Sequence, residues 1–136
     1  MPNIASLAAG DTLPGRSYKP DNVQLFLYNA ALWNAHRIHF DHPYATGVEG
    51  YPGLVIAGPM IGEWLAQCVV EWLGEAGRLV AFEYSNRKAA IIGETLRSGG
   101  TITAVHPELR EATIDLFIWN ESDEVIAPGK ATVRFD

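Results

Sequence analysis

Two histidines, an amide and a carboxylate lie within eight residues of this chain. Residues 34–41 read Asn-Ala-His-Arg-Ile-His-Phe-Asp, and Gly58-Pro59 follows seventeen residues after Asp41, at the start of a strongly apolar segment. A helix start offers backbone N–H groups that have no partner within the helix and lie at the positive end of its dipole. Acid–base side chains beside such donors are suited to moving a proton next to a polarised carbonyl group.

The elements that position these residues follow from the spacing of apolar and turn residues. A helix is predicted over residues 22–31, with Asp21 as its N-cap, and a longer one over 59–75, where adjacent apolar pairs recur every four residues. Residues 33–53 carry the histidines and are rich in Gly and Pro, which predicts a structured loop with one helical turn near 43–46.

The second half of the chain predicts a sheet. A period of two indicates strands over 79–85, 95–105, 112–119 and 130–135, with a short strand near 16–19 and an extension of the first strand over 86–90. Ser98-Gly99-Gly100 suggests a bulge or break, and the short connections predict an antiparallel meander. One long helix followed by strands predicts an α+β fold, a single domain over residues 1–136 whose curved antiparallel sheet wraps the helix.

Composition excludes several classes of protein. The chain has 136 residues, 48% of them hydrophobic, and a formal net charge of −6, which argues against a binder of nucleic acid or anionic membranes. Its one cysteine, Cys68, excludes an internal disulfide and a sulfur-rich metal site. We expect no signal peptide or membrane span, and a cytoplasmic location. His36, His39 and His42 recur at steps of three, but Pro43 argues against a helix that would gather them around a metal.

Three segments together resemble the MaoC-like hydratases and dehydratases of the hot-dog fold. They are Tyr-Asn-Ala-Ala-Leu-Trp-Asn-Ala-His-Arg-Ile-His-Phe-Asp at 28–41, Glu-Gly-Tyr-Pro-Gly-Leu-Val-Ile at 49–56, and Gly58-Pro59. The resemblance covers roughly residues 25–65, and it is greatest to the branch of hydroxyacyl-thioester dehydratases and mesaconyl-CoA hydratases. The strand pattern after residue 78 agrees with the fold but is generic.

The resemblance implies a sheet curved around one helix, dimers with sites at the subunit interface, and reversible addition of water across a 2-enoyl thioester. Coenzyme A or acyl carrier protein would carry the substrate, with no metal or redox cofactor. The broader family pattern, Asp-x-Asn-Pro-x-His-x-Asp, places its histidine on His39 and its last aspartate on Asp41. Asn34 stands at the first aspartate, as in the closer branch, and Ala57 stands where the family usually has a histidine.

The catalytic assignments follow from this match. His39 is the expected acid–base group, Asn34 the amide that orients water or substrate, and Gly58 the backbone donor to the thioester oxygen. Asn34 could equally turn the loop. Asp41 could fix the tautomer of His39, or it could cap the turn before Pro43.

The remaining candidates are substrate contacts. His36 is one, and Arg37 could bind a carboxylate or phosphate or simply pair with an acid of the loop. Arg87 and Lys88 could meet the phosphates of coenzyme A, or form an ordinary solvated pair.

The sequence therefore predicts a hydro-lyase, an enoyl-thioester hydratase that also works as a 3-hydroxyacyl-thioester dehydratase. It predicts a homodimer or higher oligomer, or a heteromer with another hot-dog subunit. One alternative is a hot-dog thioesterase, for which Glu63 and Glu71 on the apolar helix are the candidate carboxylates. The other is a non-catalytic, acyl-thioester-binding subunit, which Ala57 and Asn34 favour.

Overall fold

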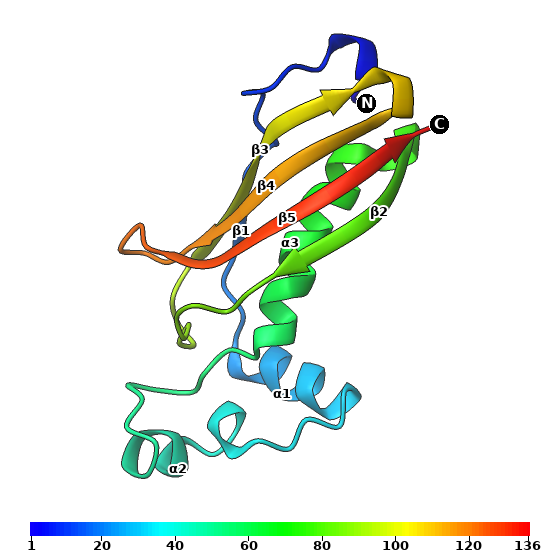
Figure 1. The fold of residues 1–136 in the computed structure, drawn as a ribbon. Helices are drawn as coiled ribbons and strands as arrows, with labels where there is room; N and C mark the ends of the chain where they lie inside the picture. Colours follow the sequence, from blue (N-terminus) through cyan, green and yellow to red (C-terminus); the bar gives the residue numbers. More distant parts are fainter.

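A curved antiparallel sheet wraps one long helix in the computed structural model, which describes residues 1–136 (Figure 1). The strands are β1 (Arg16–Tyr18), β2 (Gly77–Tyr84), β3 (Leu96–His106), β4 (Glu111–Trp119) and β5 (Val125–Phe135), in the order β1-β3-β4-β5-β2. The helices are α1 (Asn22–Ala31), α2 (His42–Gly47) and the central α3 (Gly58–Leu73). This is the α+β, hot-dog architecture that the sequence predicts.

The order of the strands departs from a simple meander. β3, β4 and β5 follow one another as predicted, but β2 pairs with β5 at the opposite edge. Residues 86–90 do not extend β2, because the chain there turns back to the segment before α3. The N–H of Ile56 donates to the carbonyl of Ala90 at 2.8 Å, and Val55 forms an isolated bridge with Ile91. This loop consequently lies beside the start of α3.

The two glycines of β3 do not break the strand. β3 runs unbroken, and its register against β4 shifts further along, between Ile102 and Ala104. A Cβ atom on Gly99 would lie 3.2 Å from the ring of Trp119, and one on Gly100 would lie 2.9 Å from a methyl group of Leu116. The prediction of a break at 98–100 is therefore wrong, since these glycines make room for side chains of β4.

The core forms where α3 meets the concave face of the sheet. Ile61, Leu65, Cys68, Val69 and Leu73 of α3 are each no more than 2% exposed. Burial raises the pKa of the Cys68 thiol, as expected for an inert core cysteine. α3 begins one residue before the predicted position and ends at Leu73, two residues before the predicted end, where its C-cap Gly74 has a φ of 55° that glycine readily adopts.

The lower part of the molecule holds α1, α2 and the loop between them (Figure 1). α1 spans the predicted residues because Asp21 and Gln24 form a capping box at its start. α2 begins at His42 with Asp41 as its N-cap, where the sequence predicts a helical turn. No helix here combines the length and the apolar character that a bilayer crossing requires.

Candidate active site

His39 and the start of α3 line the same pocket, which has a volume of about 230 Å³. His39 comes from the short 3-10 helix Arg37–His39, and Gly58 is the first residue of α3. The segment before α3 and the loop after β2 complete the walls, which are formed by Ile38, His39, Val55, Ile56, Gly58, Ile61, Asn86, Arg87, Lys88, Ala89 and Ala90. A single chain thus places the imidazole and the helix start on one cavity.

A backbone carbonyl determines the tautomer of His39. Its Nδ1 lies 2.6 Å from the carbonyl oxygen of Val55. Because a carbonyl can only accept a hydrogen bond, Nδ1 carries the proton of the neutral ring and Nε2 keeps a lone pair. The side chain is 7% exposed, and Nε2 has no hydrogen-bond partner in the protein. This nitrogen is available as a proton acceptor.

Burial also keeps this imidazole neutral. Desolvation lowers the pKa of His39 below its ordinary value of 6.5, and the nearby ring of His36 lowers it further. The bond from Nδ1 to Val55 acts in the opposite direction but is the smaller effect. At neutral pH the ring is therefore a base rather than an imidazolium.

The start of α3 presents an unpaired backbone donor to the pocket. Ala57 is the N-cap and contributes no side-chain cap, while Pro59 occupies the first turn and has no N–H. The N–H of Gly58 makes no hydrogen bond within the protein, and Gly58 lines the pocket. An N–H group at this position is suited to binding a partially negative oxygen.

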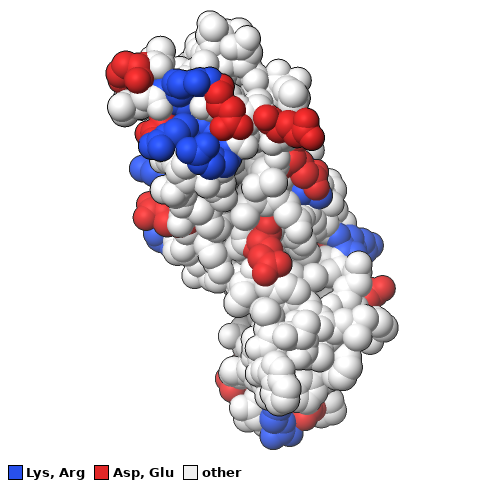
Figure 2. All heavy atoms as spheres, turned by 90° about the vertical axis from the view of Figure 1, so that its right-hand side faces the viewer, with Lys and Arg blue, Asp and Glu red and all other residues white.

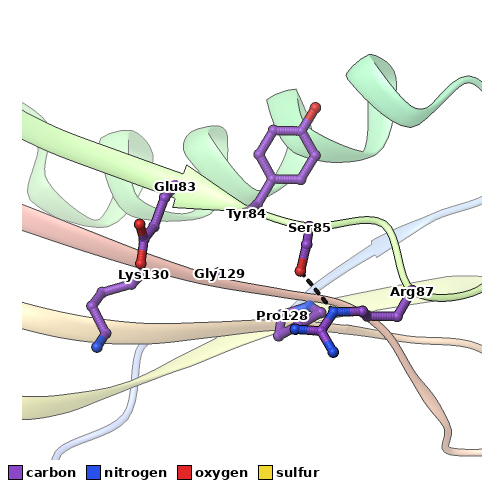
Figure 3. A pocket seen from close by; sticks show the side chains of 7 residues that line it. All are labelled: Glu83, Tyr84, Ser85, Arg87, Pro128, Gly129 and Lys130. Carbon is purple, nitrogen blue, oxygen red and sulfur yellow. Dashed lines mark hydrogen bonds between the residues drawn. The ribbon is translucent and has the colours of Figure 1, made fainter.

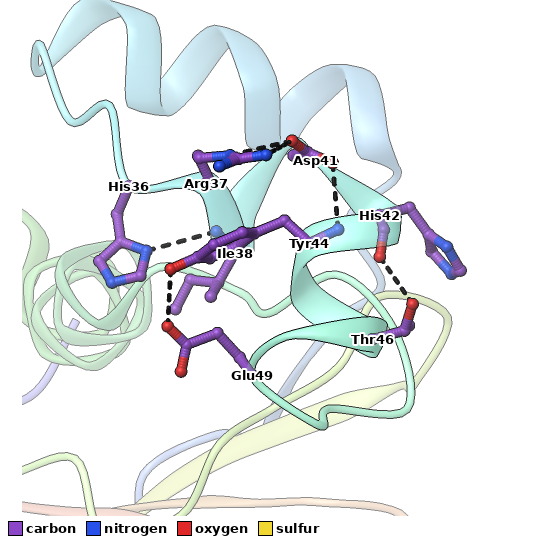
Figure 4. Close-up of polar contacts among 8 residues, drawn as sticks. All are labelled: His36, Arg37, Ile38, Asp41, His42, Tyr44, Thr46 and Glu49. Carbon is purple, nitrogen blue, oxygen red and sulfur yellow. Dashed lines mark hydrogen bonds and ion pairs between the residues drawn. The ribbon is translucent and has the colours of Figure 1, made fainter.

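The other polar residues of the loop bind one another (Figure 4). Asp41 caps α2 by accepting from the N–H of Tyr44 at 3.1 Å, and it accepts from Arg37 at 2.8 and 3.0 Å. The guanidinium of Arg37 lowers the pKa of the Asp41 carboxyl group. Of the alternatives for these two residues, the structure shows the helix cap and the loop ion pair, and Asp41 forms no hydrogen bond with His39.

Asn34 and His36 also hold the loop. The Asn34 side chain accepts from the N–H of His36 at 3.2 Å, and His36 Nδ1 accepts from the N–H of Ile38 at 3.3 Å. The ring centres of His36 and His39 are 5.8 Å apart. Neither Asn34 nor His36 lines the pocket of His39.

Asn34 instead lines a second, more apolar pocket of about 330 Å³, together with Phe26, Asn29, Ala30, Trp33, Ala35 and Phe40. Trp33 is 93% exposed and has a positive φ of 55°. Figure 2 shows that this lower part of the molecule carries few charged side chains, whereas acidic and basic groups gather near the opposite end. The face of this lower part that Figure 2 shows is therefore largely uncharged.

Arg87 links the His39 pocket to a polar one. It lines both, and the second pocket, of about 320 Å³, also contains Glu83 and Lys130 (Figure 3). Arg87 donates to the hydroxyl of Ser85 at 2.9 Å and has no acidic partner. Lys88, in contrast, is paired with Glu124. Sequence reasoning missed Lys130, which is distant in the chain, and Asn86, although it adjoins the basic pair.

Comparison with known proteins gives partial sequence matches. The chain is 50% identical to the mesaconyl-C(4)-CoA hydratase of Chloroflexus aurantiacus over 52 residues, 38% of this chain and 19% of that protein. It is 38% identical to the mitochondrial hydroxyacyl-thioester dehydratase type 2 of Schizosaccharomyces pombe over 66 residues, 43% of this chain and 22% of that protein. The chain thus spans about a fifth of the length of these curated relatives.

The fold has a close match along its whole length. The structure of an (R)-hydratase from A. caviae involved in PHA biosynthesis superimposes with a TM-score of 0.87, at 16% identity, over 96% of this chain and 98% of the other. The family model for hydroxyacyl-thioester dehydratase type 2 matches residues 5–92, which include the histidine loop, the start of α3 and Asn86. With that match, this chain belongs to the hydroxyacyl-thioester dehydratase type 2 family.

Proposed function

We propose that this protein hydrates 2-enoyl thioesters and, in the reverse direction, dehydrates 3-hydroxyacyl thioesters. The supporting observation is the shared pocket, on which the unpartnered Nε2 of His39 and the first residue of α3 both lie. A neutral imidazole can take a proton from water, and an unpaired N–H can stabilise charge on the thioester oxygen. The reaction requires both groups to contact the same substrate molecule.

The proposed chemistry conserves every atom and charge. Nε2 of His39 removes a proton from water, and the resulting hydroxide bonds to C3 of the enoyl group. The electron pair of the C2–C3 double bond moves toward C2 and the thioester oxygen, where the N–H of Gly58 stabilises the enolate. The imidazolium then returns its proton to C2, so the ring ends as it began. Dehydration is the same sequence reversed.

The carrier would extend past Arg87. Its guanidinium has no acidic partner, and Arg87 lines both the His39 pocket and the pocket of Lys130, the second of which Figure 3 shows. A phosphate of coenzyme A, or of the phosphopantetheine arm of acyl carrier protein, suits such a group. Lys88 is a weaker candidate because Glu124 neutralises it. Arg37 is similarly paired with Asp41.

The arrangement of acidic groups gives the thioesterase alternative little support. Glu63 accepts a hydrogen bond from Tyr28 at 3.1 Å, and Glu71 pairs with Arg16 at 3.1 Å. Neither carboxylate lines the pocket that holds His39. A hydrolase would need one of them beside the carbonyl carbon to direct water there.

Crotonyl-CoA distinguishes the three functions. We expect the purified protein to remove the enoyl absorbance without releasing a free thiol. Release of free thiol without hydration of the enoyl group would indicate a thioesterase. Binding of the thioester with neither change would indicate the non-catalytic subunit. Either of the last two outcomes would contradict the proposed function.

A further inference from the structure

The side chain of Asn86 lies against the first residue of α3. A Cβ atom added to Gly58 would overlap the Asn86 amide nitrogen and would lie 3.2 Å from its Cγ. Asn86 follows β2 by two residues, and it lines the His39 pocket together with Gly58. The loop that turns back from β2 therefore brings a polar side chain into contact with the proposed binding site for the thioester oxygen.

This contact accounts for glycine at position 58. The φ of Gly58 does not lie in the left-handed region, so the backbone itself would accept another residue. A side chain at position 58 would instead have to displace the Asn86 amide from the space that it occupies. The glycine thus permits the amide to approach the helix start closely.

The start of α3 supplies one backbone donor to this pocket. Pro59 has no N–H, and the N–H of Ile61 is already bonded to the carbonyl of Ala57 at 3.3 Å. The N–H of Met60 is unpaired, but Met60 lines a different pocket, with Tyr18 and Trp64. Within the first turn of α3, Gly58 therefore has no backbone neighbour that could share the developing charge on an oxygen bound here.

Asn86 is placed to be the second donor. Its exposed side-chain amide forms no hydrogen bond within the protein, and Nδ2 is its atom nearest to the Cβ position of Gly58. The buried His39, whose Nε2 has no partner in the protein, lines the same cavity, which independently indicates that a ligand belongs there. Asn side chains serve this purpose in sites that stabilise oxyanions, because the amide N–H is a donor that can reach the oxygen on which charge develops.

We infer that Asn86 is a catalytic residue that donates from Nδ2 to the thioester oxygen, alongside the N–H of Gly58. This inference rests on the proposed function, since the enolate forms only if water adds to C3. The two donors stabilise the negative charge that develops on the thioester oxygen when the electron pair of the C2–C3 double bond is displaced. The amide gains and loses no proton in the cycle.

The test compares Asn86→Ala and Asn86→Asp with the matched control Asn22→Ala, which removes an exposed amide from the start of α1. We expect kcat for hydration of crotonyl-CoA to fall about 100-fold in Asn86→Ala, as for loss of one oxyanion donor, with KM changed less than about threefold. Asn86→Asp keeps the shape of the side chain but removes its N–H donor, so kcat for this variant should fall at least as far. Asn22→Ala should match the wild type.

A second measurement tests the same donor without turnover. Acetoacetyl-CoA forms an enolate with its own ultraviolet absorbance, and a site with two donors stabilises it when bound. We expect the bound enolate signal to fall in Asn86→Ala, while binding of butyryl-CoA stays within about threefold because its carbonyl carries no such charge. If Asn86 had only a structural role, the substitution would weaken the binding of both ligands to the same extent.

The outcomes separate this inference from the proposed function. Wild-type hydration together with undiminished kcat and enolate signal in both Asn86 variants would overturn the inference and leave the function intact. A change in KM alone would also overturn it, since it would assign Asn86 to carrier binding. A wild-type protein that does not hydrate crotonyl-CoA would refute the function, and the inference with it.

Discussion

At the scale of single residues, the protonation of His39 controls the proposed reaction. The ring must be neutral to accept a proton from water, and burial holds its pKa below 6.5. Between pH 6.5 and neutrality the folded protein therefore keeps Nε2 free. The same shift affects stability, because the unfolded chain binds the proton at a pH where the folded chain does not.

We accordingly predict that kcat/KM for hydration is flat near pH 7 and declines only below pH 6.5. The contribution of His39 to folding stability should be complete above pH 6.5 and should be lost as the pH falls from there toward the lower folded pKa. NMR titration of the imidazole provides the check. A His39 pKa above 6.5 would contradict this account of the base.

His39 illustrates how much of the site the sequence could predict. The resemblance selected His39, because the surrounding motif is specific. It could not identify the partner of the ring, since the carbonyl of Val55 lies sixteen residues away and is a backbone group with no signature in the side-chain sequence. Asp41 was the nearest acid in the sequence, but its geometry as N-cap of α2 directs it to Tyr44 and Arg37.

At the scale of elements, the close contact of α3 with β2 positions the start of the helix. Tyr84, the last residue of β2, donates to the carbonyl of Gly58 at 3.4 Å. Gly62, one turn further along, leaves the space for its ring, which a Cβ atom would overlap. Glycine here makes room for the tyrosine, although within a helix it is about 1 kcal/mol less favourable than alanine.

Gly62→Ala should therefore destabilise the protein by about 1–3 kcal/mol, despite the higher helix propensity of alanine. Urea unfolding followed by circular dichroism measures this change. Gly47→Ala at the end of α2 is the matched control, because nothing lies within 4 Å of its added methyl group. We expect that control to be neutral or slightly stabilising, and a Gly62→Ala variant of equal stability would refute the packing argument.

Local patterns predicted most elements, and long-range pairing caused the errors. The capping residue Asp21 and the apolar pairs of α3 placed two helices almost to the residue. The position of β2 beside β5 could not be predicted, because it is a pairing of strands about fifty residues apart that leaves no local pattern in the sequence. The loop of residues 86–90, which lies beside the segment before α3, also brings Asn86 to Gly58. This contact likewise has no local signature in the sequence.

At the scale of the whole molecule, two surfaces lack a partner. β2 is an edge strand, and the lower part of the molecule exposes large apolar side chains, namely Val23, Phe26, Leu27, Leu32, Trp33 and Phe40. Contiguous exposed apolar surface and free strand edges are typical of association sites. We propose that two copies of this chain associate, consistent with the dimers that the resemblance implies.

Sedimentation equilibrium at micromolar concentration should accordingly give twice the chain mass of 14.9 kDa. Trp33→Ser should weaken the association, whereas Leu109→Ser, which removes an exposed leucine from a short turn after β3, should not. A monomer at all concentrations would contradict the proposed assembly without affecting the fold.

The central claim is that the lone pair on Nε2 of His39 activates the water that adds to the enoyl group. The most direct measurement is kcat/KM for hydration of crotonyl-CoA by His39→Ala, compared with the wild type and with His36→Ala, which removes the neighbouring histidine that does not line the pocket. We predict a loss of at least about 100-fold for His39→Ala and less than about threefold for His36→Ala. Hydration at an undiminished rate in a folded His39→Ala variant would contradict the claim.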